Sequence, residues 1–253
     1  MSSDKGATVA ERDQDSVDDF EDWLTQRDPN QKFMSFMFLD SVHALDFPKG
    51  LDVPYDDYWK EVDRLKLSPD FDPREYFNRY KNAAYWQDVL IGRVLRILEK
   101  NGRLDNTVVV VTSDHGEEFN DSKLNYWGHN GNFSDAQIKI PLVISWPGMP
   151  AKQISHRTTA YDVGATLLKR VLDVQNPVED FSVGQDLFEP KGRDIFFVGS
   201  YNEDAIVAGD EVLLIKMSGA LEGHSLKDWK EIDAAPLKKW VPAYLQMRGK
   251  YRQ

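Results

Sequence analysis

The feature that most constrains the fold is the stretch of residues 106–118, which changes abruptly from apolar to polar. Residues 107–111 are all β-branched, a composition typical of a strand buried on both faces, as in a parallel sheet. The second half holds Asp114, His115 and two glutamates around one glycine. Ligands in open α/β sheets bind just beyond the carboxyl ends of strands, so we expect a site at this turn.

Asp114 and His115 form a candidate metal pair at that turn. Imidazole nitrogen suits zinc and manganese, and a carboxylate oxygen also accepts magnesium or calcium. The alternative is that Asp114 caps a helix and that His115 packs in the interior. For an isolated Asp-His pair this alternative is the commoner one, so the neighbouring sequence has to decide between them.

A second histidine and a second strand follow. Residues 126–131 read Tyr-Trp-Gly-His-Asn-Gly, and residues 140–148 form an apolar run that starts at Ile-Pro and ends in Trp-Pro-Gly. Together with the Thr-Ser-Asp-His-Gly-Glu turn, this order resembles the sulfatase branch of the alkaline phosphatase superfamily. The resemblance implies that Asp114 and His115 hold a divalent metal ion (Mg, Mn, Ca or Zn), and that His129 faces the substrate or leaving group.

The resemblance also implies a fold class and a domain. We expect an α/β fold with a mainly parallel central sheet flanked by helices, a small C-terminal antiparallel sheet and a terminal helix. The 253 residues provide for one such domain over 1–253, with the main α/β part in 1–190 and the last strands and helix in 191–253.

His43 is a further candidate site residue. It lies just past residues 33–39, an apolar run of strand length. A lone histidine is commonly structural, but relatives in this superfamily carry a His-x-x-x-Pro-like segment that lines the site. The resemblance therefore implies a second-line catalytic contact for His43.

Composition excludes some classes of site and partner. The chain has no cysteine, which excludes disulfides, thiolate metal sites and a nucleophile derived from cysteine within these residues. The net charge of −11 argues against wholesale binding to nucleic acid. No apolar run is long enough to span a membrane, and no signal peptide is recognisable.

Apolar spacing predicts the remaining elements. We expect a helix over 15–24 with Val17, Phe20 and Leu24 on its buried stripe. We also expect a long helix that Pro73 opens and Asn101-Gly102 ends, with a buried stripe that consists of Phe77, Tyr80, Ala84, Asp88, Ile91, Leu95 and Leu98. The other expected elements are a short helix around 57–66, a helix over 158–172, an antiparallel meander over 194–217 and a C-terminal helix that Pro242 kinks or splits.

Enzymes of this superfamily also need an early acidic ligand after a first strand and a nucleophile at a helix N-terminus. Residues 1–32 hold neither, and Asp40-Ser41 imitates the pair without a nucleophile helix after it. We therefore expect the chain to cover roughly the later two thirds of the family's domain. On this expectation the chain alone binds metal weakly and shows no turnover.

The resemblance is narrower still, and it runs over nearly the whole chain. The chain looks most like the YejM family, also called PbgA, at residues 12–13, 18–20, 23–24, 36–44 and 119–130. That family comprises Gram-negative inner-membrane proteins with an N-terminal membrane region and a C-terminal periplasmic sulfatase-like domain. The resemblance implies a periplasmic location, a role in lipopolysaccharide homeostasis, and contact with lipid A or cardiolipin.

Two functions therefore compete, beside the plain alternative of a structural scaffold. The first is a sulfatase-like domain that keeps its metal and senses lipid. The second is a metal-dependent hydrolase or phosphoryl transferase for phosphate or sulfate esters, active when the upstream part is present. For lipid contact we consider the bases Arg248, Lys250 and Arg252 beyond Met247, because we expect Trp240 and Tyr244 to pack on the sheet.

Overall fold

The computed structural model describes residues 6–189 and 193–250. The chain divides into two compact units. The first comprises Met1–Val110 and Ile144–Met149, and the second comprises Val111–Val143 and Pro150–Gln253. The single domain expected over 1–253 stays a prediction.

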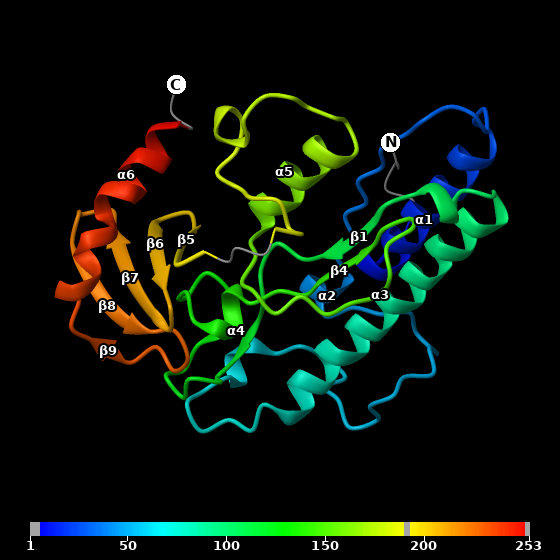
Figure 1. The fold of residues 1–253 in the computed structure, drawn as a ribbon. Coiled ribbons are helices and arrows are strands. Elements are labelled where there is room, and N and C mark those ends of the chain that lie inside the picture. Colours follow the sequence, from blue (N-terminus) through cyan, green and yellow to red (C-terminus); the bar gives the residue numbers. More distant parts are fainter. Residues whose placement is uncertain (1–5, 190–192, 251–253) are drawn as a thin grey trace. The chain divides into compact units, whose positions relative to one another are not determined.

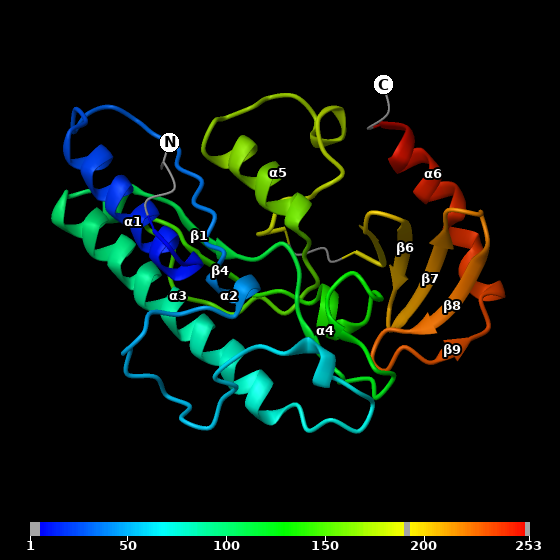
Figure 2. The same ribbon diagram turned by 180° about the vertical axis from the view of Figure 1, so that it is seen from behind.

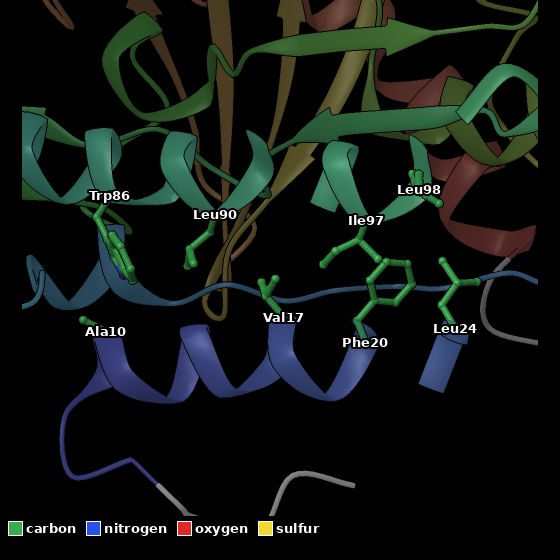
Figure 3. Close-up of a cluster of buried hydrophobic side chains, with 8 residues drawn as sticks. All are labelled: Ala10, Val17, Phe20, Leu24, Trp86, Leu90, Ile97 and Leu98. Atoms are coloured by element: carbon green, nitrogen blue, oxygen red, sulfur yellow. The ribbon is translucent and has the colours of Figure 1, made fainter. Parts of the chain in front are cut away.

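Two helices that lie side by side build the core of the first unit (Figures 1 and 2). Helix α1 (Val9–Thr25) begins at a capping box, in which Thr8 Oγ1 accepts the backbone N–H of Glu11 and the Glu11 carboxylate accepts that of Thr8. Helix α3 (Arg74–Lys100) packs along it, and their buried side chains meet in Figure 3: Ala10, Val17, Phe20, Leu24, Trp86, Leu90, Ile97 and Leu98. The predicted stripe of α1 is confirmed.

The predicted long helix is confirmed, but its buried face is displaced from the predicted stripe. Phe77 is 40% exposed and Asp88 is also exposed, whereas Tyr76 and Trp86 are buried. Two separate sets of neighbours cause this shift. Helix α1 covers one stretch of α3, and the segment before α3 covers another, where Trp59 packs against Tyr76.

The apolar run of residues 33–39 is extended but is not assigned to a strand. Its side chains alternate: Phe33, Met37 and Leu39 pack on the core, while Met34, Phe36 and Phe38 are exposed. No sheet of the described residues includes this segment, so a strand ladder does not form. The segment then enters the short helix α2 (Ser41–Ala44), and the helix expected around 57–66 shrinks to the 3₁₀ turn Arg64–Lys66.

Strands β1 (Val109–Thr112) and β4 (Leu142–Ser145) form a two-stranded sheet, and the boundary between the units passes through both strands. Both strands are where the sequence predicts them. They are half-buried rather than buried on both faces, and Val143 is 63% exposed. In a two-stranded sheet each strand is an edge, which explains the incomplete burial.

In the second unit, helix α5 (Ala160–Arg170) fixes the turn of residues 184–187. The buried Asp162 carboxylate accepts the backbone N–H groups of Thr159 and Gln185, each at 2.7 Å, and pairs with Arg193. Gly184 is required here, because a Cβ atom at that position would lie 2.2 Å from the carbonyl oxygen of Tyr161.

The second unit also contains a five-stranded antiparallel sheet, whose strands lie in the same order as in the sequence (Figures 1 and 2). Its strands are β5 (Ile195–Gly199), β6 (Glu203–Ala208), β7 (Glu211–Lys216), β8 (Leu221–Ser225) and β9 (Glu231–Ile232). A 3₁₀ helix (Ala235–Trp240) runs into α6 (Val241–Lys250), so Pro242 falls in the first turn of α6 and the predicted split is confirmed. Trp240 and Tyr244 pack on the sheet, as expected.

No helix among the described residues has the length and apolar character needed to cross a membrane.

Candidate functional site

Three side chains of the second unit gather into a group that could hold a metal ion. Each of His115, Glu117 and His129 offers one ligand atom, and these atoms lie within 4.8 Å of one another. All three residues are half-buried. The group unites the Asp-His-Gly-Glu turn with the Gly-His loop, as the sequence order predicts.

A short antiparallel pairing brings the two segments together. Strand β2 (Glu118–Phe119) pairs with β3 (Trp127–Gly128), and Glu118 lies opposite Gly128. Continuing that register by one residue places Glu117 opposite His129. The Nδ1 atom of His129 is 2.8 Å from Oε2 of Glu117, and these side chains are only 22% and 11% exposed.

Hydrogen bonds fix the tautomer of both histidines in their neutral form. His115 Nδ1 lies 2.8 Å from the carbonyl oxygen of Gly116, which only accepts, so Nδ1 carries the proton. His129 Nδ1 donates to the Glu117 carboxylate in the same way. In both rings the lone pair is therefore on Nε2. A histidine that binds metal through Nε2 commonly donates its Nδ1–H to a carboxylate or a backbone carbonyl, as these two rings do. The rings stack with centroids 3.9 Å apart.

Gly116 is required by a close approach of the backbone. A Cβ atom at this position would lie 2.3 Å from the carbonyl oxygen of Ala136. The approach allows Gly116 N–H to donate to the carbonyl oxygen of Gln137 at 2.8 Å. Helix α4 (Asp135–Ile138), which contains both partners, thereby supports the turn between His115 and Glu117.

Glu118 lies beside the group and is fully buried. Burial by itself raises the pKa of its carboxyl group, but hydrogen bonds from Ser122, Gln137 and Asn132 outweigh the burial and hold the pKa below its ordinary value. The side chain is therefore an anion in the interior at neutral pH.

Asp114 lies next to the group of three but is not one of its members. Its side chain is 73% exposed, its Oδ1 atom accepts the backbone N–H of His115, and its Oδ2 atom is 3.8 Å from His115 Nε2. Its ligand role stays a prediction from the family resemblance. Sequence reasoning missed Glu117, although a second acid two residues after a candidate metal histidine was a usable signal.

The other predicted site histidine, His43, belongs to the first unit. His43 lies on α2 in the first unit, where its Nδ1 atom is 3.4 Å from Oδ1 of Asp40. Its catalytic role stays a prediction. Ser41 is fully buried and its hydroxyl donates to the Asp13 carboxylate at 2.5 Å, so this hydroxyl is not exposed for attack on a substrate.

The donor set fits a divalent transition ion. Two imidazoles and one carboxylate are common ligands of zinc, whereas magnesium and calcium prefer oxygen donors throughout. Three protein ligands also leave a coordination position for water or substrate, as in catalytic zinc sites. The same Glu117–His129 pair has the geometry of a carboxylate-oriented acid–base histidine.

Comparison with known proteins identifies the family. The sulfatase family model matches residues 3–174. The chain is 32% identical over 167 residues to the inner membrane protein YejM of Salmonella typhimurium, which covers 64% of this chain and 28% of that protein. The chain thus spans less than a third of the length of this relative.

Solved structures show the same fold. The phosphonate monoester hydrolase of Agrobacterium radiobacter matches with a TM-score of 0.65 at 18% identity, covering 92% of this chain and 60% of that one. An alkaline phosphatase superfamily protein from Vibrio parahaemolyticus matches with a TM-score of 0.59 at 15% identity, covering 100% and 58%. The predicted α/β fold class, with its small C-terminal antiparallel sheet, is confirmed. The chain belongs to the sulfatase family.

Proposed function

We propose that this chain is the metal-bearing part of a periplasmic, sulfatase-like domain in a YejM-like inner-membrane protein. On this proposal the whole protein acts in lipopolysaccharide and outer-membrane lipid homeostasis and contacts an anionic lipid such as lipid A or cardiolipin. The 32% identity to an inner membrane protein supports the membrane association. The acidic chain and the family membership support a role in binding or ester chemistry rather than in nucleic-acid binding.

The observation that carries the proposal is the group of His115, Glu117 and His129, with three ligand atoms within 4.8 Å. When bound, a divalent ion supplies Lewis-acid polarisation of ester oxygens and lowers the pKa of a bound oxygen nucleophile. The protein side chains hold the ion, and Glu117 orients the imidazole of His129. We further propose Asp114 as a ligand beside His115.

Metal binding by the isolated chain tests this proposal. Isothermal titration calorimetry should show weak binding of zinc or manganese, and still weaker binding of calcium and magnesium, because two donors are imidazoles. His129→Gln should abolish most of the affinity. His156→Gln is the matched control, since this half-buried histidine is not in the group. Equal affinity of the two variants would reject the site.

A second function, hydrolysis or transfer of a phosphate or sulfate ester, is favoured by the Glu117–His129 pair. A histidine oriented by a carboxylate is suited to protonate a leaving group once its Nε2 atom carries a proton, so in this function Nε2 of His129 is not a metal ligand. The similarity in fold to a phosphonate monoester hydrolase supports the same class of reaction. The test is hydrolysis of an aryl phosphate and an aryl sulfate by the chain extended upstream, with His129→Gln as the variant. Turnover that this variant leaves unchanged would exclude the pair from the chemistry.

A further inference from the structure

We infer that Glu118 is a positioning residue for the group of His115, Glu117 and His129. Its buried carboxylate ties together the two segments that carry these side chains. The inference rests on the proposed function only where metal binding is the measured quantity.

The Glu118 carboxylate is held by neutral donors from two directions. Its Oε1 atom accepts the backbone N–H of Ser122 at 3.3 Å and the Ser122 hydroxyl at 2.6 Å. Its Oε2 atom accepts from Asn132 Nδ2 at 2.8 Å, Ser134 Oγ at 3.3 Å and Gln137 Nε2 at 2.7 Å. Together these bonds compensate for the burial of a charge, and they are lost together if the carboxylate is removed.

Gln137 connects this network to both histidine segments. Its Oε1 atom accepts the backbone N–H groups of Gly131 at 3.2 Å and Asn132 at 3.3 Å, just after His129. Its carbonyl oxygen accepts the N–H of Gly116, the residue after His115, at 2.8 Å. Gln137 therefore contacts both segments. Its side chain, which Glu118 fixes, holds the loop after His129, and its backbone carbonyl holds the turn after His115.

The pleat of the strand separates the tasks of the two glutamates. Consecutive side chains of a strand point to opposite faces. Glu117 therefore contacts His129 on one face, while Glu118 enters the buried network on the other. Removing the Glu118 carboxylate leaves every candidate ligand in the chain but removes what aligns them.

The network is anchored to the five-stranded sheet. Asp135 N–H, at the start of α4, donates to the carbonyl oxygen of Leu226 at 2.8 Å. Phe133 belongs to the buried cluster on that sheet, with its ring 6.5 Å from that of Trp229. The core of the unit thus fixes residues 132–137, which donate hydrogen bonds to Glu118. Through these bonds Glu118 keeps the group of three aligned.

Three variants of the full chain test the inference. Glu118→Ala removes every bond of the carboxylate. Glu118→Gln keeps the shape, and its oxygen still accepts from Asn132 and Gln137. Its amide nitrogen can donate to the Ser122 hydroxyl but loses the bond from the Ser122 N–H. Asp162→Asn is the matched control, because Asp162 is another buried, multiply bonded carboxylate of the same unit. It lies in α5 and accepts the N–H groups of Thr159 and Gln185 instead.

The first readout is zinc affinity by calorimetry. Loss of a residue that orients metal ligands typically reduces affinity about 10- to 100-fold. We expect a loss in this range for Glu118→Ala and a smaller one for Glu118→Gln. Asp162→Asn should lower the melting temperature and leave the affinity within about twofold. An equal loss of affinity in Asp162→Asn would overturn the inference, because general destabilisation would then explain it.

The second readout needs no metal. Nitrogen-15 NMR of the histidine rings should show His129 protonated at Nδ1 in the parent chain, with that proton protected by Glu117. Glu118→Ala should broaden or lose this signal, and Glu118→Gln should weaken it if the alanine variant does not fold. Failure of the parent chain to bind zinc contradicts only the proposed function. An unchanged His129 signal in a folded Glu118 variant contradicts the positioning role.

Discussion

The Nδ1 atom of His129 lies 2.8 Å from the Oε2 atom of Glu117, across the β2–β3 pairing. This contact joins two segments that are separate in the sequence: the polar turn after β1 and the loop after β3. It fixes the tautomer of His129 and places the Glu117 carboxylate beside that ring, within the group of three.

The first prediction compares Glu117 with Asp114. Glu117→Gln removes the negative charge that holds the His129 ring, so zinc affinity should fall about 10- to 100-fold. Asp114→Asn should cost less, because its side chain is 73% exposed and lies outside the group of three. Calorimetry measures both. The reverse order of losses would assign the metal to Asp114 and His115, the pair that the sequence suggests.

The second prediction concerns acid stability. The folded state holds the pKa of Glu118 below its ordinary value of 4.5, so its ionised form stabilises the fold. This contribution is fully present above the unfolded-state pKa and is lost as the pH falls through the folded-state pKa. Between pH 6 and about pH 3, the free energy of unfolding in urea titrations should therefore fall more steeply for the parent chain than for Glu118→Gln. Parallel curves would show that the pKa of Glu118 is the same in the folded and unfolded states, and would contradict the lowered pKa.

The third prediction uses two glycines. Gly116→Ala places a Cβ atom 2.3 Å from the Ala136 carbonyl oxygen, so the chain must shift. Overpacking of this kind typically costs about 1–3 kcal/mol, and the shift should also weaken zinc binding. Gly164→Ala in α5 is the control, since a Cβ there meets no atom within 4 Å. It should stabilise the chain by about 0.5–1 kcal/mol. Denaturant titration measures the free energy of unfolding of both variants. Equal changes in the two variants would contradict the argument that Gly116 is required by close packing.

The fourth prediction concerns anionic lipid. Among the bases beyond Met247, Arg248 pairs with Asp204 at 3.1 Å and Lys250 donates to the carbonyl oxygen of Glu179 at 2.9 Å, while Arg252 lies outside the described residues. Changing all three bases to Gln should weaken binding of the chain to cardiolipin vesicles in a salt-dependent manner. Because two of the bases have internal contacts, the expected loss is modest. Vesicle binding that the triple variant leaves intact would place the lipid contact elsewhere.

The sequence predicts elements well wherever local pattern and neighbours agree. Val17, Phe20 and Leu24 recur at helical spacing, and all three are buried. Pro242 lies in the first turn of the last helix, where proline is tolerated. By contrast, Met34, Phe36 and Phe38 have strand composition, yet their segment pairs with none of the described strands. Whether a strand forms depends on a partner, which local composition does not contain. Strand β8, with Gly223 and His224 inside it, lacks any apolar run and was missed.

The site was predicted in part. The sequence predicts His115 and His129 as candidate site residues, because the order and spacing of the turn after β1 and of the Gly-His loop resemble those of the family. Glu117 and Glu118 are adjacent acids in the sequence, and nothing local shows that one faces a histidine while the other is buried. Their separation depends on the register of β2 with β3 and on Gln137, which are long-range features.

The most direct test of the metal group is the position of the ion itself. Crystals of the chain grown with zinc should give one anomalous difference peak at the zinc edge, within bonding distance of His115, Glu117 and His129. Zinc–nitrogen and zinc–oxygen distances of about 2.0–2.2 Å are expected. A peak bound by Asp114 and His115 without Glu117 and His129, or no peak at saturating zinc, would contradict this assignment.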